Sequence, residues 1–185
     1  MLLTDRQIHD AIYLTGELEI SPFDYDEHLQ PASVDIQLGP EISGYRKSTG
    51  ALNPLLGVHP QDMWHLTLHA KYKSVPLQPG EFILAHTLQA VRIGSTLACR
   101  IEGKSSLARM GLVVHSTAGF VDPGFQGQLT LEMTNLNSVP VILTLGMPIA
   151  QLSFMRLSEA VAHPYGSPRY RSHYQGQRGA TAPRV

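Results

Sequence analysis

One short segment of the chain groups the side chains that bind phosphate best. Lys104, Ser105, Ser106 and Arg109 lie within six residues, directly after Gly103. A lysine ammonium supplies a point charge, an arginine guanidinium can bind two phosphate oxygens at once, and hydroxyls and backbone N–H groups complete the hydrogen bonds. These residue types at this spacing favour a site for a phosphate chain.

Two other interpretations of this segment have to be weighed. A Walker P-loop needs a glycine five residues before Gly103, and Ala98 stands there, so that motif is excluded. The strand–helix context of a P-loop is missing as well. The stretch 105–109 is equally typical of the start of a solvated helix, and the residues alone leave both possibilities open.

Two carboxylates follow the basic segment. Asp122 opens the turn sequence DPGFQG, and Glu132 lies in an alternating segment, on the side opposite to Leu131 and Met133. A carboxylate beside a bound substrate can act as general acid and base. The ordinary alternatives are an Asx turn for the aspartate and a solvent-exposed strand position for the glutamate. The basic segment nearby in the sequence favours the functional interpretation of Glu132.

Histidine and cysteine do not form a metal-binding pattern. The chain has nine histidines, and His65 and His69 have ligand spacing for a helix, but in an alternating segment they only share one face of a strand. With Cys99 as the one cysteine, the zinc-deaminase signature H-x-E with P-C-x-x-C cannot be built. We therefore predict no metal site made by the protein, and structural or solvent-facing roles for His115, His163 and the other histidines.

The composition predicts one ordinary domain. A length of 185 residues suits a single domain, and 43% hydrophobic with 16% charged residues is a globular balance. Fourteen basic against fifteen acidic side chains give a net charge of −1, without the basic excess that a nucleic-acid polymer requires. No export signal follows Met1, no segment has the length of a membrane span, and a single cysteine fits a reducing compartment. We expect a cytoplasmic protein with no nucleic-acid or membrane partner.

The elements that must position the candidate residues begin with a helix. Thr4 and Gln7 have capping-box spacing, and Leu3 and Ile8 have the spacing of a hydrophobic staple, so we predict a helix that ends near Gly16. Downstream the period changes to two. The alternating or apolar segments, each bounded by turn residues, are 33–38, 63–69, 81–85, 97–101, 128–133, 139–143 and 149–154. Many short strands of this kind predict an antiparallel sandwich or barrel, in one mainly β domain over residues 1–162.

Residues 163–185 differ from the rest of the chain. They contain four arginines and no acidic residue, whereas residues 1–162 carry 10 basic and 15 acidic side chains, a net charge of −5. The segment is also rich in Gly, Ser, Pro, Tyr and Gln. We interpret it as a mobile basic tail of the same domain. It is either a frayed terminus or a lid that closes over an anionic ligand.

Several motifs in register resemble one family. The segments are QPASVD (30–35), GKSSLARMGL (103–112), HSTAGFVDPGF (115–125), GMPIAQL (146–152) and YQGQRG (174–179). Together they closely resemble the dCTP deaminases of the trimeric dUTPase superfamily, and the match runs over nearly the whole chain. The resemblance implies a distorted jelly-roll of the dUTPase-like (β-clip) type, a homotrimer with sites at subunit interfaces, and a tail that closes over the nucleotide. It also implies zinc-independent deamination of dCTP, with Mg²⁺ held by the triphosphate and water.

The resemblance implies a role for each matched residue. Glu132 would take a proton from the water that attacks C4 of cytosine and later help to protonate the leaving ammonia. Ser105 and Arg109 would orient that water and stabilise charge. Lys104, Ser106 and Arg109 would hold the triphosphate, Asp122 would meet the deoxyribose 3′-hydroxyl, and Thr130 and Leu131 would present their backbone to the base. The nucleotide-binding set is completed by Ser105, Leu107, Ala108, Glu132, Gln151, Tyr165 and Gln177. Ala118 lies in the loop that family members rearrange when dTTP inhibits them.

Two residues of that loop indicate a branch of the family. Deaminase-only members carry His-Arg after the Thr-Ala pair, and Gly119-Phe120 stands here, which resembles the bifunctional branch. That branch converts dCTP to dUMP, ammonia and pyrophosphate for dTMP synthesis, and dUTP is a possible substrate. The alternatives are a deaminase that releases dUTP and, more distantly, a non-catalytic nucleotide-binding protein of the dUTPase fold. The tail sequence 178–183 lacks the Gly-Ser/Thr-Gly motif of a dedicated dUTPase.

Overall fold

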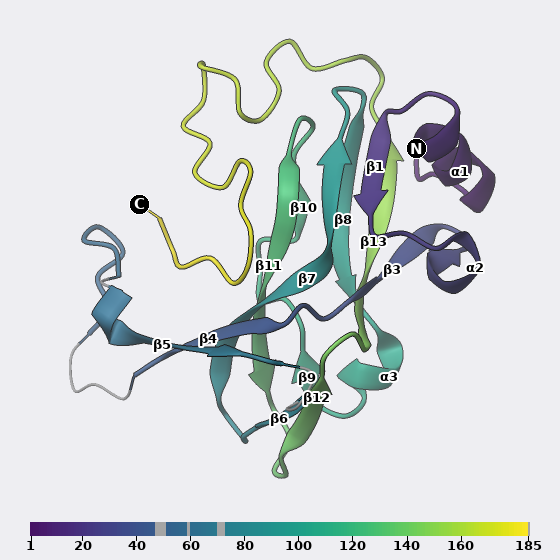
Figure 1. The fold of residues 1–185 in the computed structure, drawn as a ribbon. Helices are drawn as coiled ribbons and strands as arrows, with labels where there is room; N and C mark the ends of the chain where they lie inside the picture. The colour runs from purple at the N-terminus through teal and green to yellow at the C-terminus, as the bar shows by residue number, and fades with distance from the viewer. Residues whose placement is uncertain (47–50, 59, 70–72, 185) are drawn as a thin grey trace.

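Two antiparallel sheets face each other and enclose the core (Figure 1). The computed structural model describes residues 1–46, 51–58, 60–69 and 73–184. One sheet has the strand order β5-β4-β7-β11-β9, with β1 also paired to β7, and the other has the order β10-β8-β13-β3-β2. A separate pair joins β12 and β6. The sheets stay open in the described part of the chain, so the predicted mainly β jelly-roll is confirmed as a sandwich and the barrel alternative is wrong.

The described elements have the following bounds. The helices are α1 (Asp5–Tyr13), α2 (Tyr25–His28) and α3 (Ser105–Ala108), with a 3-10 turn at Pro60–Asp62. The strands of the larger sheet are β1 (Leu18–Ser21), β4 (Glu41–Tyr45), β5 (Met63–Thr67), β7 (Phe82–Ile93), β9 (Leu112–Val113) and β11 (Gln126–Asn135). The other strands are β2 (Leu29–Gln30), β3 (Ser33–Gln37), β8 (Leu97–Gly103), β10 (Phe120–Val121) and β13 (Pro148–Arg156), with β6 (Ser74–Leu77) and β12 (Val141–Thr144) as the separate pair.

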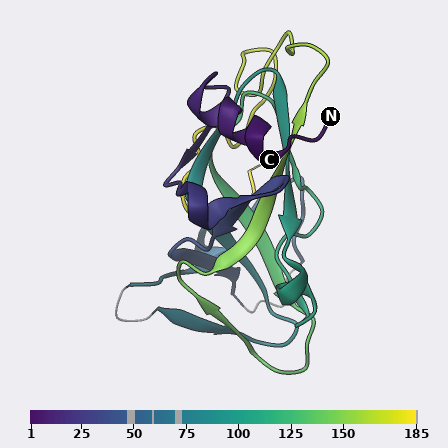
Figure 2. The same cartoon turned by 90° about the vertical axis from the view of Figure 1, so that its right-hand side faces the viewer.

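The N-terminal helix forms as its sequence predicts. The backbone N–H of Thr4 donates to the side chain of Gln7 at 3.1 Å, and Leu3 and Ile8 are both fully buried. The helix ends at Tyr13, and Gly16 takes a left-handed conformation with φ of 64°. Figure 2 shows α1 and α2 on the same flank of the sandwich, away from α3. No helix in the described ranges is long and apolar enough to cross a membrane.

Each predicted strand segment contains a strand in the structure, and the differences in length and exposure have physical reasons. The run 81–85 is the start of a twelve-residue strand, β7. Its continuation was missed in the sequence because the polar residues His86, Thr87 and Gln89 interrupt the apolar pattern, although all three are buried. The segment 63–69 forms β5, but Leu66 is 39% exposed, since among the described strands β5 pairs with β4 alone. The sequence does not predict β4 and β6, which are short and lack strict alternation, nor β1, whose alternation from Leu18 to Ser21 covers only four residues.

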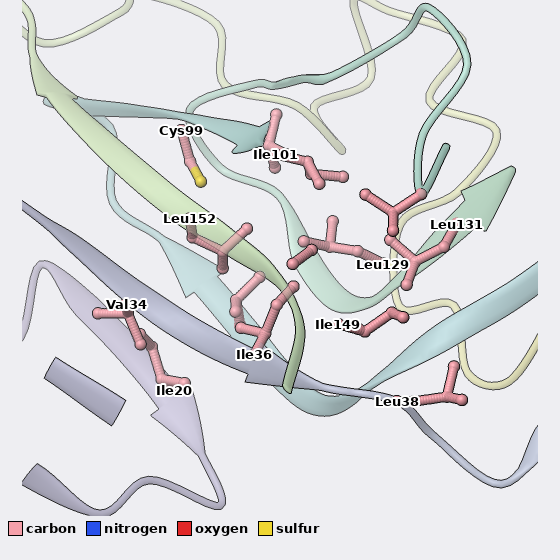
Figure 3. Packing of buried hydrophobic residues seen from close by; sticks show 14 of the residues in the cluster. Ile20, Val34, Ile36, Leu38, Cys99, Ile101, Leu129, Leu131, Ile149 and Leu152 are labelled. Atoms are coloured by element: carbon pink, nitrogen blue, oxygen red, sulfur yellow. The ribbon is translucent and has the colours of Figure 1, made fainter. Parts of the chain in front are cut away.

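The core lies between the two sheets (Figure 3). Ile36, Leu152 and Phe154 come from one sheet and are fully buried, and Leu131 and Met133 come from the other. Along β11 burial alternates with every residue from Gly127 to Asn135. This alternation confirms the predicted apolar stripe, and it turns the intervening side chains, Glu132 among them, to the opposite face.

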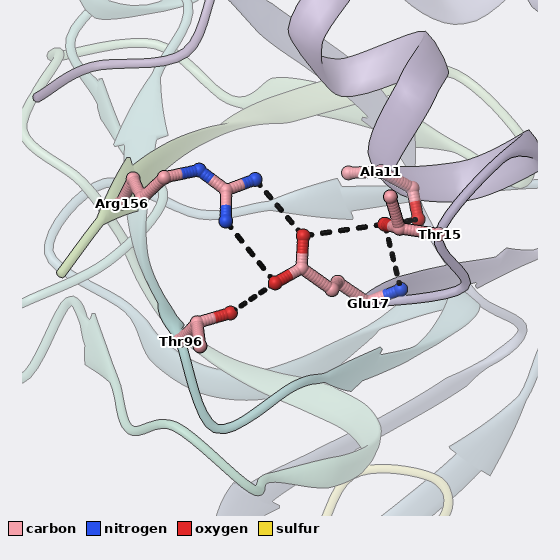
Figure 4. Close-up of polar contacts among 5 residues, drawn as sticks. All are labelled: Ala11, Thr15, Glu17, Thr96 and Arg156. Carbon is pink, nitrogen blue, oxygen red and sulfur yellow. Dashed lines mark hydrogen bonds and ion pairs between the residues drawn. The ribbon is translucent and has the colours of Figure 1, made fainter. Parts of the chain in front are cut away.

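A partly exposed ion pair joins the connection between α1 and β1 to the end of β13 (Figure 4). The Arg156 guanidinium donates to both carboxylate oxygens of Glu17, at 3.1 and 2.9 Å, and the hydroxyls of Thr96 and Thr15 donate to the same carboxylate. The arginine and the hydroxyls lower the pKa of Glu17 from 4.5 to about 2. The cluster therefore joins the α1–β1 connection, the β7–β8 connection and β13 through one carboxylate.

Replacing this carboxylate should destabilise the fold in a pH-dependent way. We expect Glu17→Gln to lower the free energy of unfolding at pH 7 by about 1 kcal/mol, because a charge-assisted pair of partly exposed groups contributes on that order. A carboxylate with a lowered folded-state pKa stabilises the protein above its unfolded pKa, so the difference should be complete above pH 4.5 and disappear as the pH falls to about 2. Urea unfolding at a series of pH values measures it.

Glu19→Gln is the matched control. Glu19 also pairs with an arginine, Arg92, but on the exposed edge strand β1, so we expect almost no change in stability. Equal losses for the two variants would contradict the assignment, as would a loss for Glu17→Gln that persists unchanged to the lowest pH.

Candidate active site

Glu132 lies at the centre of the candidate site, and His115 holds it. Its carboxylate Oε2 is 2.9 Å from His115 Nδ1, and the side chains are 31% and 13% exposed, respectively. The register explains the contact: β9 pairs Val113 with Thr134, and continuing this antiparallel register places His115 opposite Glu132. An ionised carboxylate only accepts hydrogen bonds, so Nδ1 is the donor. His115, for which a structural or solvent-facing role is predicted, thus lies largely buried against Glu132, and its register with Glu132 is the signal that was missed in the sequence.

A cavity of about 440 Å³ opens in front of Glu132. Seven residues predicted for the site line it, and they are Ala118, Phe120, Asp122, Thr130, Glu132, Tyr165 and Gln177. Tyr45, Phe82, Leu84 and Tyr174 add apolar and aromatic walls. This volume and lining are typical of a pocket for a small organic ligand. Leu131 is fully buried in the core, so its backbone is what it can offer to the site.

Two side chains of the cavity carry unused hydrogen-bonding atoms. Thr130 Oγ1 and Gln177 Oε1 are buried, and neither has a partner among the described residues. A buried polar atom without a partner costs free energy, and such atoms in a pocket are commonly satisfied by a ligand or water. One donor-acceptor hydroxyl and one carbonyl acceptor are therefore available for a polar ligand.

The C-terminal tail forms one wall of the cavity. The N–H of Gln128 donates to the carbonyl of Gln177 at 3.0 Å, and the Gln177 amide donates to the carbonyl of Gln128 at 2.7 Å. The Tyr174 N–H donates to the Tyr165 hydroxyl at 3.0 Å. Figure 1 shows the tail turning back to lie beside β10 and β11. The described tail is thus packed on the strand that carries Glu132, and Val185 lies outside the described residues.

The basic segment 104–109 lies in another part of the molecule. It begins where β8 ends and forms the short helix α3, with Leu107 buried and Ser105, Ser106 and Arg109 exposed. Lys104 Nζ is 2.6 Å from Asp35 Oδ2, and the other oxygen of Asp35 is buried without a partner in the described structure. Asp35 was missed because an alternating strand position gives no sign of a long-range ion pair.

Gln151 supports the same segment from β13. The Ser33 hydroxyl donates to Gln151 Oε1 at 3.0 Å, and the Gln151 amide donates to the carbonyl of Gly103 at 3.2 Å. Gln151 therefore fixes the turn that leads into α3. Within the described residues, neither Gln151 nor any of 104–109 lines the 440 Å³ cavity. A single chain thus carries the predicted site residues as two separate groups.

The described side chains offer no cage for a metal ion. No group of three or more His, Cys, Asp or Glu side chains is placed to ligate one within the described ranges. A hard cation at this site would have to take most of its ligands from a bound molecule and water.

The fold and the divided site define a dUTPase-like β-sandwich. A crystal structure of 2′-deoxycytidine 5′-triphosphate deaminase from Agrobacterium tumefaciens aligns with a TM-score of 0.64 at 20% identity, over 88% of this chain and 49% of that chain, so this chain spans about half of its length. The dUTPase of Staphylococcus bacteriophage 80alpha aligns with a TM-score of 0.50 at 15% identity, over 79% of this chain and 94% of that one. At these identities the likeness concerns the fold alone.

The sequence comparisons are more specific. A family model described as dCTP deaminase-like matches residues 2–157, and the chain belongs to this family. A protein of Streptomyces coelicolor is 46% identical over 185 residues, covering 100% of this chain and 95% of the relative. A protein of Bifidobacterium animalis subsp. lactis is 43% identical over 194 residues, covering 100% and 94%. Both relatives are named "dCTP deaminase, dUMP-forming".

The attachment of the tail can be tested at Gly127. A Cβ there would come within 2.8 Å of the Gln177 carbonyl oxygen and 3.0 Å of its nitrogen, both backbone atoms of the tail. We expect Gly127→Ala to push the tail off β11 and to speed tryptic cleavage after Arg178 roughly tenfold, because cleavage requires local release of the chain. Gln126→Ala is the control, since the hydrogen bonds of Gln126 to the tail come from its backbone, whose N–H donates to the Gln175 side chain and whose carbonyl accepts from the Gly176 N–H. Equal cleavage rates for both variants would show that this contact does not hold the tail.

Proposed function

We propose that this protein converts dCTP to dUMP, ammonia and pyrophosphate, with two molecules of water consumed. The observation that carries the proposal is the Glu132 carboxylate, held by His115 and directed to a cavity that also presents Thr130 and Gln177. The names and whole-chain similarity of the relatives support dCTP as substrate and dUMP as product. The product would supply dTMP synthesis, and we expect the reaction in the cytoplasm.

In the deamination step Glu132 acts as general base and then as general acid. It accepts a proton from a water whose oxygen bonds to C4 of cytosine and passes this proton to N3; it then transfers the proton of the new C4 hydroxyl to the amino group, so that ammonia leaves and a C4 carbonyl beside N3–H remains. The imidazole of His115 keeps the carboxylate oriented throughout. Ser105 and Arg109 orient the water and stabilise the charge that develops.

The cavity recognises the nucleoside. Thr130 and the backbone of Leu131 face the base, Asp122 accepts a hydrogen bond from the deoxyribose 3′-hydroxyl, and Tyr165 and Gln177 enclose the nucleotide from the tail. The unpartnered atoms Thr130 Oγ1 and Gln177 Oε1 support this assignment, because a pyrimidine nucleoside offers both donors and acceptors. The tail then acts as the lid of a site formed largely by residues 1–162.

The segment 104–109 binds the triphosphate. Lys104, Ser106 and Arg109 contact phosphate oxygens, with the backbone of Leu107 and Ala108 beside them, and Gln151 supports the turn. Mg²⁺ would be held here by the phosphates and water and would supply neutralisation of their charge. Because α3 does not line the cavity, Ser105 and Arg109 come from a neighbouring copy in a homotrimer.

The second step cleaves the triphosphate. A second water, positioned near Asp122, attacks the α-phosphorus, and pyrophosphate leaves. Phe120 lines the cavity beside Asp122, and the loop 118–120 thus shapes the space under the sugar and the α-phosphate. dTTP carries the same sugar and triphosphate and would compete for the site as an inhibitor, through the loop at Ala118. Free dUTP would enter at this second step.

Product analysis tests the whole proposal. With dCTP and Mg²⁺, we expect anion-exchange chromatography to show dUMP and pyrophosphate rising together with ammonia, and no accumulation of dUTP. Glu132→Gln should abolish ammonia release, because an amide cannot accept the proton, and should still be stabilised against heat by dCTP with Mg²⁺. Accumulating dUTP would identify a deaminase that stops after the first step. Binding without any product from the unaltered protein would identify a non-catalytic binder.

Mixed trimers test the shared site. Glu132→Gln and Arg109→Ala should each be inactive alone. After the two variants are refolded as a 1:1 mixture, we expect roughly a quarter of the wild-type activity. The reason is that random assembly places an intact Glu132 of one copy beside an intact Arg109 of the next at about a quarter of the interfaces. The double variant Glu132→Gln/Arg109→Ala, mixed with either single variant, is the control and should stay inactive. No recovery in the mixture would place both groups in one chain's own site.

A further inference from the structure

Gly119 is buried against the ring that orients Glu132. A Cβ at this position would lie 2.9 Å from Nε2 and 3.2 Å from Cδ2 of His115, and 3.1 Å from the carbonyl oxygen of Ile101. The contact with Nε2 is closer than side-chain carbons tolerate and the other two are tight, so any side chain at position 119 requires the imidazole or its other neighbours to move.

The backbone on both sides of this contact is fixed. The Ile101 N–H donates to the carbonyl of Gly119 at 2.9 Å, and the next two residues, Phe120 and Val121, pair with Arg100 and Cys99 of β8. Strand β8 is itself paired with β13 over seven residues. The imidazole of His115 is therefore the neighbour that yields, since its position depends on side-chain torsions alone.

We infer that Gly119 is a positioning residue for the deamination step: its bare Cα leaves the space that His115 needs to hold the Glu132 carboxylate at 2.9 Å. Displacing the ring releases Glu132 Oε2 from its one hydrogen bond among the described residues. The carboxylate then rotates freely, and a general base misplaced by about 1 Å loses on the order of a hundredfold in rate.

This inference rests on the proposed function, and it assigns different roles to Gly119 and Phe120, the two neighbouring residues of one motif. Phe120 is exposed and lines the cavity, so it contacts the ligand directly. Gly119 does not line the cavity and acts through His115. The pair therefore combines a wall residue with a residue that orients the general base.

The test is a cycle of variants at the two positions. We expect Gly119→Ala to lower kcat for ammonia release about ten- to hundredfold, with the KM for dCTP changed by less than about threefold, since the substrate contacts remain. His115→Ala should lower kcat by a similar factor, and His115→Asn, whose amide N–H replaces Nδ1–H, should recover most of it. Adding Gly119→Ala to His115→Ala should cost nothing further, because the ring that the methyl group displaces is gone.

Stability provides an independent reading of the same cycle. Gly119→Ala should lower the thermal unfolding midpoint alone, and should lower it clearly less in the His115→Ala background, where the contact with the Ile101 carbonyl is what remains, so the cycle is informative even if the single variant folds poorly. Ser116→Ala, an exposed position in the same loop, is the control and should keep wild-type kcat and midpoint.

Two outcomes would overturn the inference. One is an equal loss of kcat from Gly119→Ala with and without His115, and the other is wild-type kcat in His115→Ala. If Glu132→Gln is inactive while these variants behave as wild type, the proposed function stands and this inference alone fails. If Glu132→Gln retains ammonia release, the assignment of the general base itself is wrong.

Discussion

Strand β11 faces two environments, and its two-residue period makes this possible. Leu131 and Met133 are buried in the core, while Thr130 and Glu132 line the cavity on the other face. Strand β7 pairs with β11 along most of its length and β9 pairs with its end, so the register is fixed from both sides. A slip by one residue would bury the carboxylate and expose leucine to the ligand. Core packing therefore sets the direction of the candidate base.

The two sheets also explain why the candidate site is divided. Glu132 belongs to the sheet of β7 and β11, whereas the segment 104–109 leaves β8 and is fixed to β3 and β13 through Asp35 and Gln151. A rigid sandwich cannot bring these groups together by a small movement of one sheet. If a second copy supplies the missing group, activity becomes a property of the assembly. Under the proposed function, the Lys104–Asp35 ion pair is the contact with which a bound triphosphate would compete.

The parts that the sequence predicts are those with local causes. The capping box at Thr4, the stripe of β11 and the carboxylate on its opposite face depend on neighbours along the chain, and all three are present. The length of β7 was underestimated because buried polar side chains such as His86 interrupt its apolar pattern. The contacts of His115 with Glu132 and of Asp35 with Lys104 were not predicted, because each depends on strand registers between segments far apart in the sequence.

The loop 115–120 shows why function and packing are hard to separate here. Ala118 and Phe120 line the cavity, while His115 and Gly119 lie behind it, one beside Glu132 and the other beneath the imidazole. A six-residue loop thus shapes the cavity with one set of residues and, under the proposed function, orients the general base with the other. Because β10 anchors the loop's end to β8, a change in one set cannot be absorbed by shifting the loop as a whole. The glycine is the position with the least freedom, since the ring and a fixed carbonyl occupy the space where any side chain would begin.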